Sequence, residues 1–155
     1  MRQKKRSAPS AAVRRADSTT PRVAEDVQTR AVREEIQQVL NKVMQMYREE
    51  ASGPEIAEVF YEEDATAIGQ GGNGPPHDRK AIESFMIEHV EEERNCVLSI
   101  VGPVQCSGQL ASAYVSAHLP DAKLAEHVDA RMFLVFRKGR KGWRVIQEMY
   151  IWGSY

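Results

Sequence analysis

The sequence predicts an α+β fold in which a strongly curved, mixed and mostly antiparallel sheet forms a cone around three N-terminal helices. The order of the segments carries this prediction. Residues 60–69 read as a helix end that passes into a short strand, and one amphipathic helix follows. From residue 96 onward the pattern is typical of strands alone, and the run 142–155 reads as the last strand. Such a sheet leaves a pocket between itself and the helices.

The chain is expected to begin with a disordered basic tail, residues 1–25, followed by one domain over residues 26–155. Residues 1–22 are rich in Arg, Lys, Ser, Ala, Pro and Thr, and Asp17 is their one acid. This composition offers too little apolar surface to offset the entropy of ordering the segment. A total of 155 residues fits a single domain. The formal net charge of −1 argues against a nucleic-acid partner.

Apolar residues at helical spacing predict the three helices. The first is expected from about residue 24 to 50, where Ser52-Gly53-Pro54 follows as a helix break. A short second helix is expected over 54–61. The third is expected over 78–94, and its inner stripe contains His89, for which a packed, hydrogen-bonded core position is favoured over a catalytic role.

Strands and turns account for the remaining segments. A brief strand is expected over 66–69, and the glycine-rich stretch 69–76 is interpreted as a lid or connector, since it lacks the residue order of a phosphate-binding loop. The later strands are expected over 96–106, 110–119, 129–137 and 143–155, with the final hairpin turn at 138–142.

The two cysteines and the lack of a long apolar run limit the cellular compartments in which the protein is expected. Within one extended strand, Cys96 and Cys106 would lie ~30 Å apart, whereas a disulfide needs Cα atoms within about 7 Å. We therefore expect a reducing, cytoplasmic environment. No run approaches the ~18 apolar residues of a membrane span. The cysteine spacing does not suit zinc, and we expect neither a metal nor a cofactor.

Three stretches resemble the SnoaL-like branch of the nuclear transport factor 2-like superfamily. They are Tyr61-x-x-Asp64-Ala65-x-x-Ile68-Gly69, the segment 77–82 (HDRKAI) and the segment 142–146 (GWRVI). The resemblance covers about residues 27–155 and implies a cone-shaped fold, also called cystatin-like or ketosteroid isomerase-like. The superfamily contains isomerases, polyketide cyclases, dehydratases, epoxide hydrolases and non-catalytic dimeric modules, so the fold alone leaves the function open.

The resemblance also excludes one mechanism. The general base of the steroid isomerases matches Gly69, their protonated acid matches Met132, and their oxyanion tyrosine falls near Gln45, or at Met44 or Met46 if the alignment moves by one residue. None of these positions holds the required group. Steroid isomerisation by that mechanism is therefore not expected, although the pocket can persist.

Alternation along the last strand divides its side chains between two faces. One face holds Arg144, Ile146, Glu148, Tyr150 and Trp152, and the other holds Val145, Gln147, Met149 and Ile151. The family's terminal aromatic residue matches Trp152 and faces the cavity, so the resemblance turns the first set inward. The apolar second set would then face outward, where a second subunit is expected to cover it as a homodimer.

The same alignment turns Tyr114, Ser116 and His118 inward, together with Met132, Leu134 and Phe136. A turn centred on Arg140 would place Met132 opposite Glu148. A small hydrophobic molecule is the expected partner of this pocket. The expected ligand-binding residues are Trp152, Tyr150, Met132, Leu134, Phe136, Tyr47, Phe85 and Ile68.

Glu148 is the leading candidate for a catalytic base. A carboxylate among Met132, Tyr150 and Trp152 would be poorly solvated, so its pKa and its basicity near neutral pH should rise. Tyr114 and His118 would then act as hydrogen-bond donors or proton carriers. This arrangement suits a cofactor-independent isomerase, cyclase or dehydratase that acts on a hydrophobic oxygenated metabolite next to a carbonyl.

Two other interpretations remain open at this point. A register slip of one residue would exchange the faces and pair Glu148 with Arg131 or Arg144, and Tyr114 and His118 would then be ordinary residues at the wet mouth of the cone. The chain would in that case be a dimeric module that holds a ligand unchanged, or a structural dimer whose basic tail contacts a partner.

Overall fold

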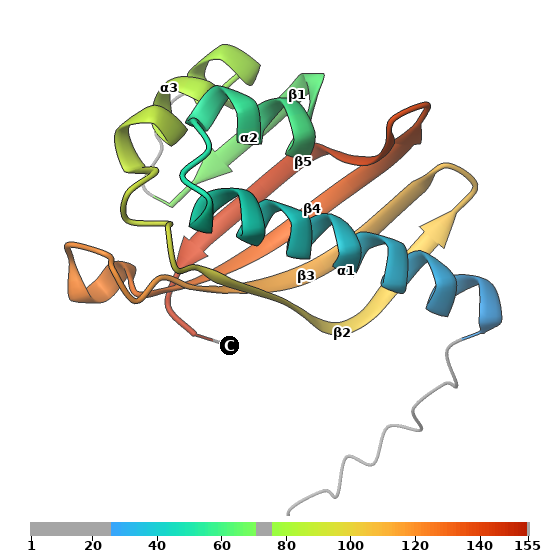
Figure 1. The fold of residues 1–155 in the computed structure, drawn as a ribbon. Coiled ribbons are helices and arrows are strands. Elements are labelled where there is room, and N and C mark those ends of the chain that lie inside the picture. The colour runs from blue at the N-terminus through green and yellow to red at the C-terminus, as the bar shows by residue number, and fades with distance from the viewer. Residues whose placement is uncertain (1–25, 71–75, 155) are drawn as a thin grey trace, which may run out of the picture.

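A computed structural model describes residues 26–70 and 76–154 of the protein. Three α-helices lie on one side of a five-stranded sheet that curves around α1 (Figure 1). The predicted tail and most of the predicted glycine-rich loop lie outside the described residues. The elements are α1 (Val27–Arg48), α2 (Gly53–Phe60), β1 (Tyr61–Gly69), α3 (Arg79–His89), β2 (Val97–Ser107), β3 (Leu110–His118), a 3₁₀ turn (Ala125–His127), β4 (Asp129–Gly139) and β5 (Gly142–Trp152).

The sheet is mixed, as predicted, and it is not closed. Its strand order is β1-β5-β4-β3-β2, with β1 parallel to β5 and all other neighbours antiparallel. The last strand in chain order therefore lies between the first strand and the meander. This arrangement confirms the predicted α+β class and brings residues of β1 beside residues of β5.

Capping side chains define where the helices begin. The carboxylate of Asp26 accepts a hydrogen bond from the amide of Thr29 at 2.7 Å, and that of Asp78 accepts one from the amide of Ala81 at 2.9 Å. Both contacts satisfy amide groups that have no partner inside the helix. The first helix thus begins three residues later than its predicted start at residue 24.

Two predicted boundaries were wrong. The predicted second helix ended at Tyr61, but that residue opens a nine-residue strand where only 66–69 was expected. The predicted third helix continued to residue 94, but α3 ends at His89 and residues 90–95 form turns. The second difference matters for the cavity described below, because the turn directs Glu93 toward the interior.

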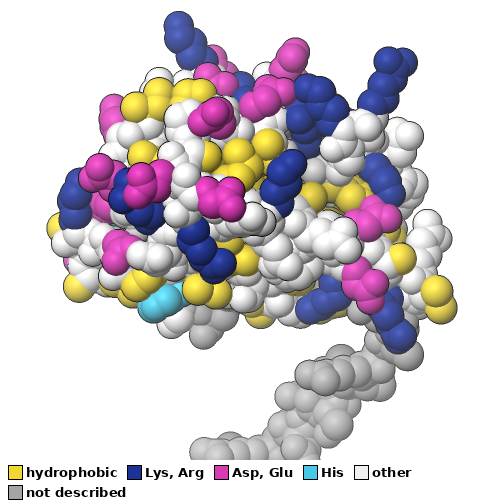
Figure 2. Space-filling model, viewed as in Figure 1, with side chains coloured by type: hydrophobic (Ala, Val, Ile, Leu, Met, Phe, Trp, Pro, Cys, Tyr) yellow, Lys and Arg dark blue, Asp and Glu magenta, His cyan; other side chains and the backbone are white. Residues whose placement is uncertain are grey.

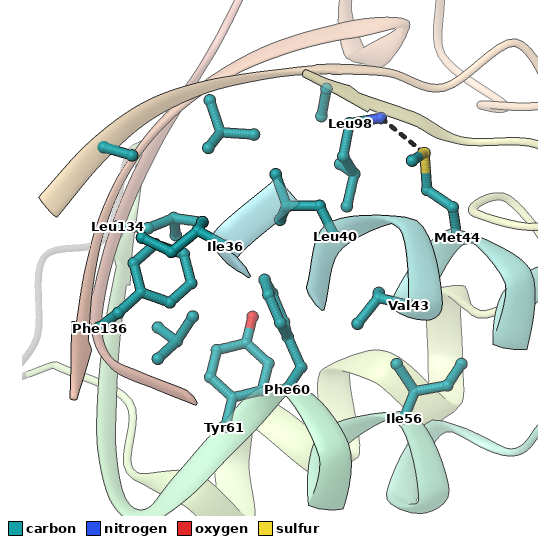
Figure 3. Packing of buried hydrophobic residues seen from close by; sticks show 14 of the residues in the cluster. Ile36, Leu40, Val43, Met44, Ile56, Phe60, Tyr61, Leu98, Leu134 and Phe136 are labelled. Carbon is teal, nitrogen blue, oxygen red and sulfur yellow. Dashed lines mark hydrogen bonds between the residues drawn. The ribbon is translucent and has the colours of Figure 1, made fainter. Parts of the chain in front are cut away.

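The core fills the space between α1 and the concave face of the sheet. Figure 3 shows Ile36, Leu40 and Val43 of α1 directed toward Leu134 and Phe136 of β4. All five side chains are at most 1% exposed. Burial of such side chains contributes roughly 1.5–3 kcal/mol each relative to exposure, so this layer holds α1 on the sheet.

A bulge in β5 corrects the predicted division of its faces. Phe136 pairs with Val145, whereas Val135 pairs with Gln147, so Ile146 is the extra residue. Such an insertion reverses the alternation beyond it. Val145 is therefore fully buried, although it was predicted to face outward with Gln147.

The bulge also moves the predicted cross-strand partners. Leu134 lies opposite Glu148, and Met132 lies opposite Tyr150, not opposite Glu148 as predicted. Arg144, which was predicted to share the face of Glu148, lies 3.7 Å from the carboxylate of Glu58 on α2.

Acidic and basic side chains are interspersed over the face seen in Figure 2, with hydrophobic side chains between them. Within the described residues, no helix combines the length and apolar character needed to cross a bilayer.

Candidate functional site

A cavity of about 160 Å³ opens between the helices and the inner face of the sheet. Its wall combines aromatic rings with two carboxyl groups, those of Glu93 and Glu148. For scale, an engineered cavity of about 150 Å³ in another protein binds benzene. The space therefore fits a molecule of about one ring. The aromatic residues of the wall are Tyr47, Phe60, Tyr61, Phe85, Tyr150 and Trp152.

Glu148 on β5 is held by a hydroxyl from β1. The hydroxyl of Tyr61 donates a hydrogen bond to the Oε2 atom of Glu148, because the parallel pairing of β1 with β5 sets the two strands side by side. Burial raises the pKa of Glu148, and the hydrogen bond from Tyr61 partly offsets this rise. Burial also raises the pKa of Tyr61 well above its usual range, so Tyr61 remains a donor.

Glu93 forms a second carboxyl–tyrosine pair in the same cavity. The hydroxyl of Tyr47 on α1 donates a hydrogen bond to this carboxyl group. Burial raises the pKa of Glu93 to about 7, and the nearby charge of Glu148 contributes to the rise. Sequence analysis missed Glu93, because the predicted helix continued through it.

The two carboxyl groups thus differ in their proton affinity. The negative charge of Glu148 contributes to the raised pKa of Glu93, which is consistent with Glu148 losing its proton first. The two carboxyl groups of the cavity therefore lose their protons at different pH, Glu148 before Glu93. Two neighbouring acids with separated pKa values are the usual basis of paired base and acid roles.

A row of rings forms the entrance of the cavity. A second hollow of about 230 Å³, here called the mouth, shares Phe85, Tyr150 and Trp152 with the cavity. The ring of Tyr150 meets that of Trp152 edge to face at 5.5 Å, and lies 6.4 Å from that of Phe85. His89 stacks on Phe85 at 4.1 Å, and His127 stacks on Trp152 at the same distance. The wall shared by the two hollows is therefore aromatic, with a histidine stacked at each end.

His89 therefore lies at the mouth. The prediction that it packs within the core was wrong. Its Nδ1 atom lies 2.9 Å from the carbonyl oxygen of Phe85. Polar contacts fix the rim beside it: the carboxylate of Glu92 accepts from the amide of Lys123 at 3.0 Å, and Asn95 donates to Asp121 at 2.7 Å.

Most of the predicted pocket residues lie in the cavity wall. The structure brings Glu148, Tyr150, Trp152, Met132, Tyr47 and Phe85 together there. Their roles in binding or catalysis stay predictions.

Three predicted ligand-binding residues do not line the cavity. Leu134 and Phe136 are completely buried in the core, where they pack beneath α1. Ala67 lines the cavity. Its neighbour Ile68 therefore faces the other side of the sheet, because successive side chains of a strand alternate.

The two predicted proton donors, Tyr114 and His118, lie outside the cavity. The inner face of β3 is formed by Ala111, Ala113, Val115 and Ala117, which are at most 5% exposed. Tyr114 is 52% exposed, and His118 pairs with Asp129 on the surface at 2.9 Å. The alternation of β3 could have predicted this outcome, because the buried face carries the smaller and more apolar side chains. The hydroxyl groups that lie in the cavity instead are those of Tyr61 and Tyr47, which donate to the two carboxyl groups.

Cys96 also lines the cavity, but its environment suppresses nucleophilic chemistry. Burial raises the pKa of this thiol to about 12, so the reactive thiolate form is scarce near neutral pH. In residues 26–70 and 76–154, no group of three His, Cys, Asp or Glu side chains is arranged to hold a metal ion.

Comparison with known proteins supports the fold. No family model and no curated protein matches the chain. Solved structures do: an NTF2-like protein of unknown function from Methylobacillus flagellatus has a TM-score of 0.61 at 18% identity, covering 78% of this chain and 91% of that one. An NTF2-like protein of unknown function from Silicibacter pomeroyi has a TM-score of 0.62 at 13% identity, covering 83% and 100%.

A third structure, an NTF2-like protein with a cystatin-like fold from Novosphingobium aromaticivorans, has a TM-score of 0.57 at 18% identity and covers 84% of this chain and 94% of that one. The chain therefore has the NTF2-like, cystatin-like fold, as the resemblance in its sequence implied.

Proposed function

We propose that this protein is a cofactor-independent enzyme that moves protons on a small hydrophobic molecule held in the cavity. The observation that carries the proposal is the pair of buried carboxyl groups, each hydrogen-bonded to a tyrosine and facing one space of about 160 Å³. The cavity size suits a one-ring substrate, and its apolar wall suits hydrocarbon.

Each carboxyl group has a definite role in this proposal. Glu148, in its carboxylate form, removes a proton from carbon next to a carbonyl or imine group. Glu93, in its protonated form, donates to the oxygen or nitrogen on which electrons accumulate. Tyr61 and Tyr47 orient the two carboxyl groups. The reaction class is isomerisation, cyclisation or dehydration, all of which can begin with this step.

Solvent deuterium exchange tests the proposal and does not require the final product to be identified. The protein is incubated in D₂O with one-ring ketones such as cyclohexanone and with cyclic imines, and loss of the α-proton signal is followed by proton NMR. We expect catalysed exchange in at least one compound and a loss of roughly 100-fold or more in Glu148→Gln. Glu91→Gln, an exposed neighbour of the site, is the matched control.

Two results would contradict the enzyme assignment. Exchange that persists in Glu148→Gln would remove the proposed base. Binding of the ring compounds without any exchange would favour a ligand-binding module of the same fold.

We further propose that the protein acts as a homodimer through the outer face of the sheet. An apolar row crosses all five strands there, because each member pairs with the next: Val101, Tyr114, Phe133, Met149 and Ile68. Tyr114 and Met149 are 52% and 55% exposed. A continuous apolar row of this kind on the outer face of the sheet suits a second copy related by a two-fold axis.

A further inference from the structure

Four of the polar side chains in the cavity wall form the two carboxyl–tyrosine pairs, and these mainly accept hydrogen bonds; the others are His77, Cys96, Tyr150 and Trp152. The Tyr61 hydroxyl directs its one proton to Glu148, and the Tyr47 hydroxyl directs its one proton to Glu93. What these four groups offer a ligand is therefore mainly carboxyl and phenol oxygen. Among the described residues that line the cavity, none is a lysine or an arginine.

The apolar part of the wall fits the same kind of ligand. Six aromatic side chains line the cavity, and two of them, Tyr150 and Trp152, stand edge to face at its entrance. The faces of aromatic rings attract organic cations, most strongly where water is excluded. A neutral molecule would form no ion pair with a carboxylate, and an anion would be repelled by it.

We propose that the ligand of the cavity is a small hydrophobic organic cation, a one-ring amine or imine bound in its protonated form. Its nitrogen lies against the carboxyl groups of Glu93 and Glu148, and its ring lies against the aromatic wall. This inference rests on the proposed function only in using the same cavity, and it selects the nitrogen compounds among the substrates considered there.

A protonated imine would also balance the charges of the proposed reaction. The Glu148 carboxylate takes a proton from the carbon next to the iminium group, and the C–H electron pair becomes the double bond of an enamine. The carboxyl group and the enamine are then both neutral. No further reactant is needed, and the apolar cavity contains less charge after the step than before it.

Cation binding should also displace a proton from the protein. At pH 6 most of the Glu93 carboxyl groups are protonated, and a bound ammonium group favours the carboxylate. The charged and titratable groups that interact with Glu93 are Tyr47, Glu148, His89, Glu92, Tyr61, Cys96 and Tyr150. With a cationic ligand the nitrogen already carries its proton, so Glu93 pairs with it as a carboxylate and does not act as the acid. We therefore expect release of about one proton for each cation bound at pH 6 and much less at pH 8.

Isothermal titration calorimetry with benzylamine and benzyl alcohol tests the inference, since the two molecules have the same number of heavy atoms and differ in charge. For the full chain we expect benzylamine to bind at least about tenfold more tightly. Titrations at pH 6 in two buffers of different ionisation enthalpy measure the released proton. Glu93→Gln and Glu148→Gln should each reduce the preference for the amine, whereas Glu91→Gln should retain it.

The outcomes separate the two proposals. Equal or tighter binding of benzyl alcohol would overturn the cation preference and leave the cavity and its proton chemistry intact. Absence of binding by both compounds would also overturn the preference, and deuterium exchange would then decide the fate of the enzyme assignment. Should a glutamine variant fail to fold by circular dichroism, the wild-type comparison of amine and alcohol and the wild-type proton release still decide the question.

Discussion

Tyr150 lies directly across from Gly69, and its ring occupies the space that any side chain at position 69 would need. The two residues are paired between β5 and β1. A Cβ atom on Gly69 would overlap the ring and the hydroxyl of Tyr150. In the resemblance to steroid isomerases, position 69 matches the general base. Here the ring of Tyr150 on the adjacent strand occupies that space. The carboxyl groups of the cavity belong instead to Glu148 on β5 and Glu93 in the turn after α3.

Gly69→Ala should therefore destabilise the protein, because the added methyl group must displace the Tyr150 ring. Overpacking of this kind costs typically about 1–3 kcal/mol. Urea unfolding of four proteins, the wild type, the two single variants and Gly69→Ala/Tyr150→Ala, measures the coupling. The alanine at 69 should cost much less in the Tyr150→Ala background.

Gly139→Ala is the control for this cycle, since its Cβ would meet only the flexible tip of Glu62 at 3.4 Å. An equal cost of Gly69→Ala in both backgrounds would show that the ring of Tyr150 does not occupy this space.

Tyr61→Phe should raise the pKa of Glu148 further, because the hydroxyl of Tyr61 supplies the hydrogen bond that lowers it. The buried carboxylate also loses its partner, so we expect a loss of about 1–3 kcal/mol of unfolding free energy at pH 7. Carbon-13 NMR titration of the carboxyl groups and urea unfolding measure the two effects. Tyr114→Phe, outside the cavity, is the matched control for the titration of Glu148. An unchanged titration of Glu148 would contradict the assigned hydrogen bond.

The stability of the protein should fall between about pH 4.5 and pH 7 through Glu93. Its pKa rises from 4.5 to about 7 on folding, so the folded state binds the proton more tightly than the unfolded state. The contribution is complete below the unfolded pKa and is lost as the pH passes the folded pKa. At about 1.4 kcal/mol per pKa unit, the loss is at most roughly 3–4 kcal/mol.

Urea unfolding at pH 4.5, 6 and 8 measures this slope in the wild type and in Glu93→Gln. The difference between the two proteins removes the contributions of surface acids such as Glu58 and Asp64, whose pKa values are lowered by Lys141 and Arg137 respectively. Parallel profiles for the two proteins would count against a buried, protonated Glu93.

The outer apolar row should form the dimer interface. Analytical ultracentrifugation of the wild type should give a dimer, and Met149→Glu should give a folded monomer, because a charge in the centre of the covered row would lose its hydration. Ile87→Glu, on the exposed side of α3 and 57% exposed, should leave the dimer unchanged. A wild-type monomer at micromolar concentration would refute the proposed interface.

The order of the elements could be predicted because long periodic segments report burial directly. The apolar stripe predicted α1, and the resemblance identified Leu134 and Phe136 as inward-facing, which their burial confirms. The resemblance also turned Tyr150 and Trp152 inward toward Met132, because alternation divides a strand into two faces but does not show which of them is buried.

The remaining parts of the site depend on local irregularities that the sequence pattern does not predict. The extra residue Ile146 interrupts the alternation of β5, so the partner of Glu148 is Leu134 and not Met132. The early end of α3 brings Glu93 into the cavity, whereas a continued helix would have taken it elsewhere. Tyr61 became a partner of Glu148 only through the parallel pairing of β1 with β5, which joins residues 87 positions apart.

A nascent chain acquires the cavity late. β2, β3 and β4 follow one another and can pair as they are made, but β1 has no strand beside it until β5 lies between it and β4. During synthesis, β1 therefore lacks its neighbouring strand until β5 emerges, and incompletely paired intermediates are prone to aggregate. Completion of the sheet and the hydrogen bond from Tyr61 to Glu148 then form together, so a chain that ends before β5 would lack both.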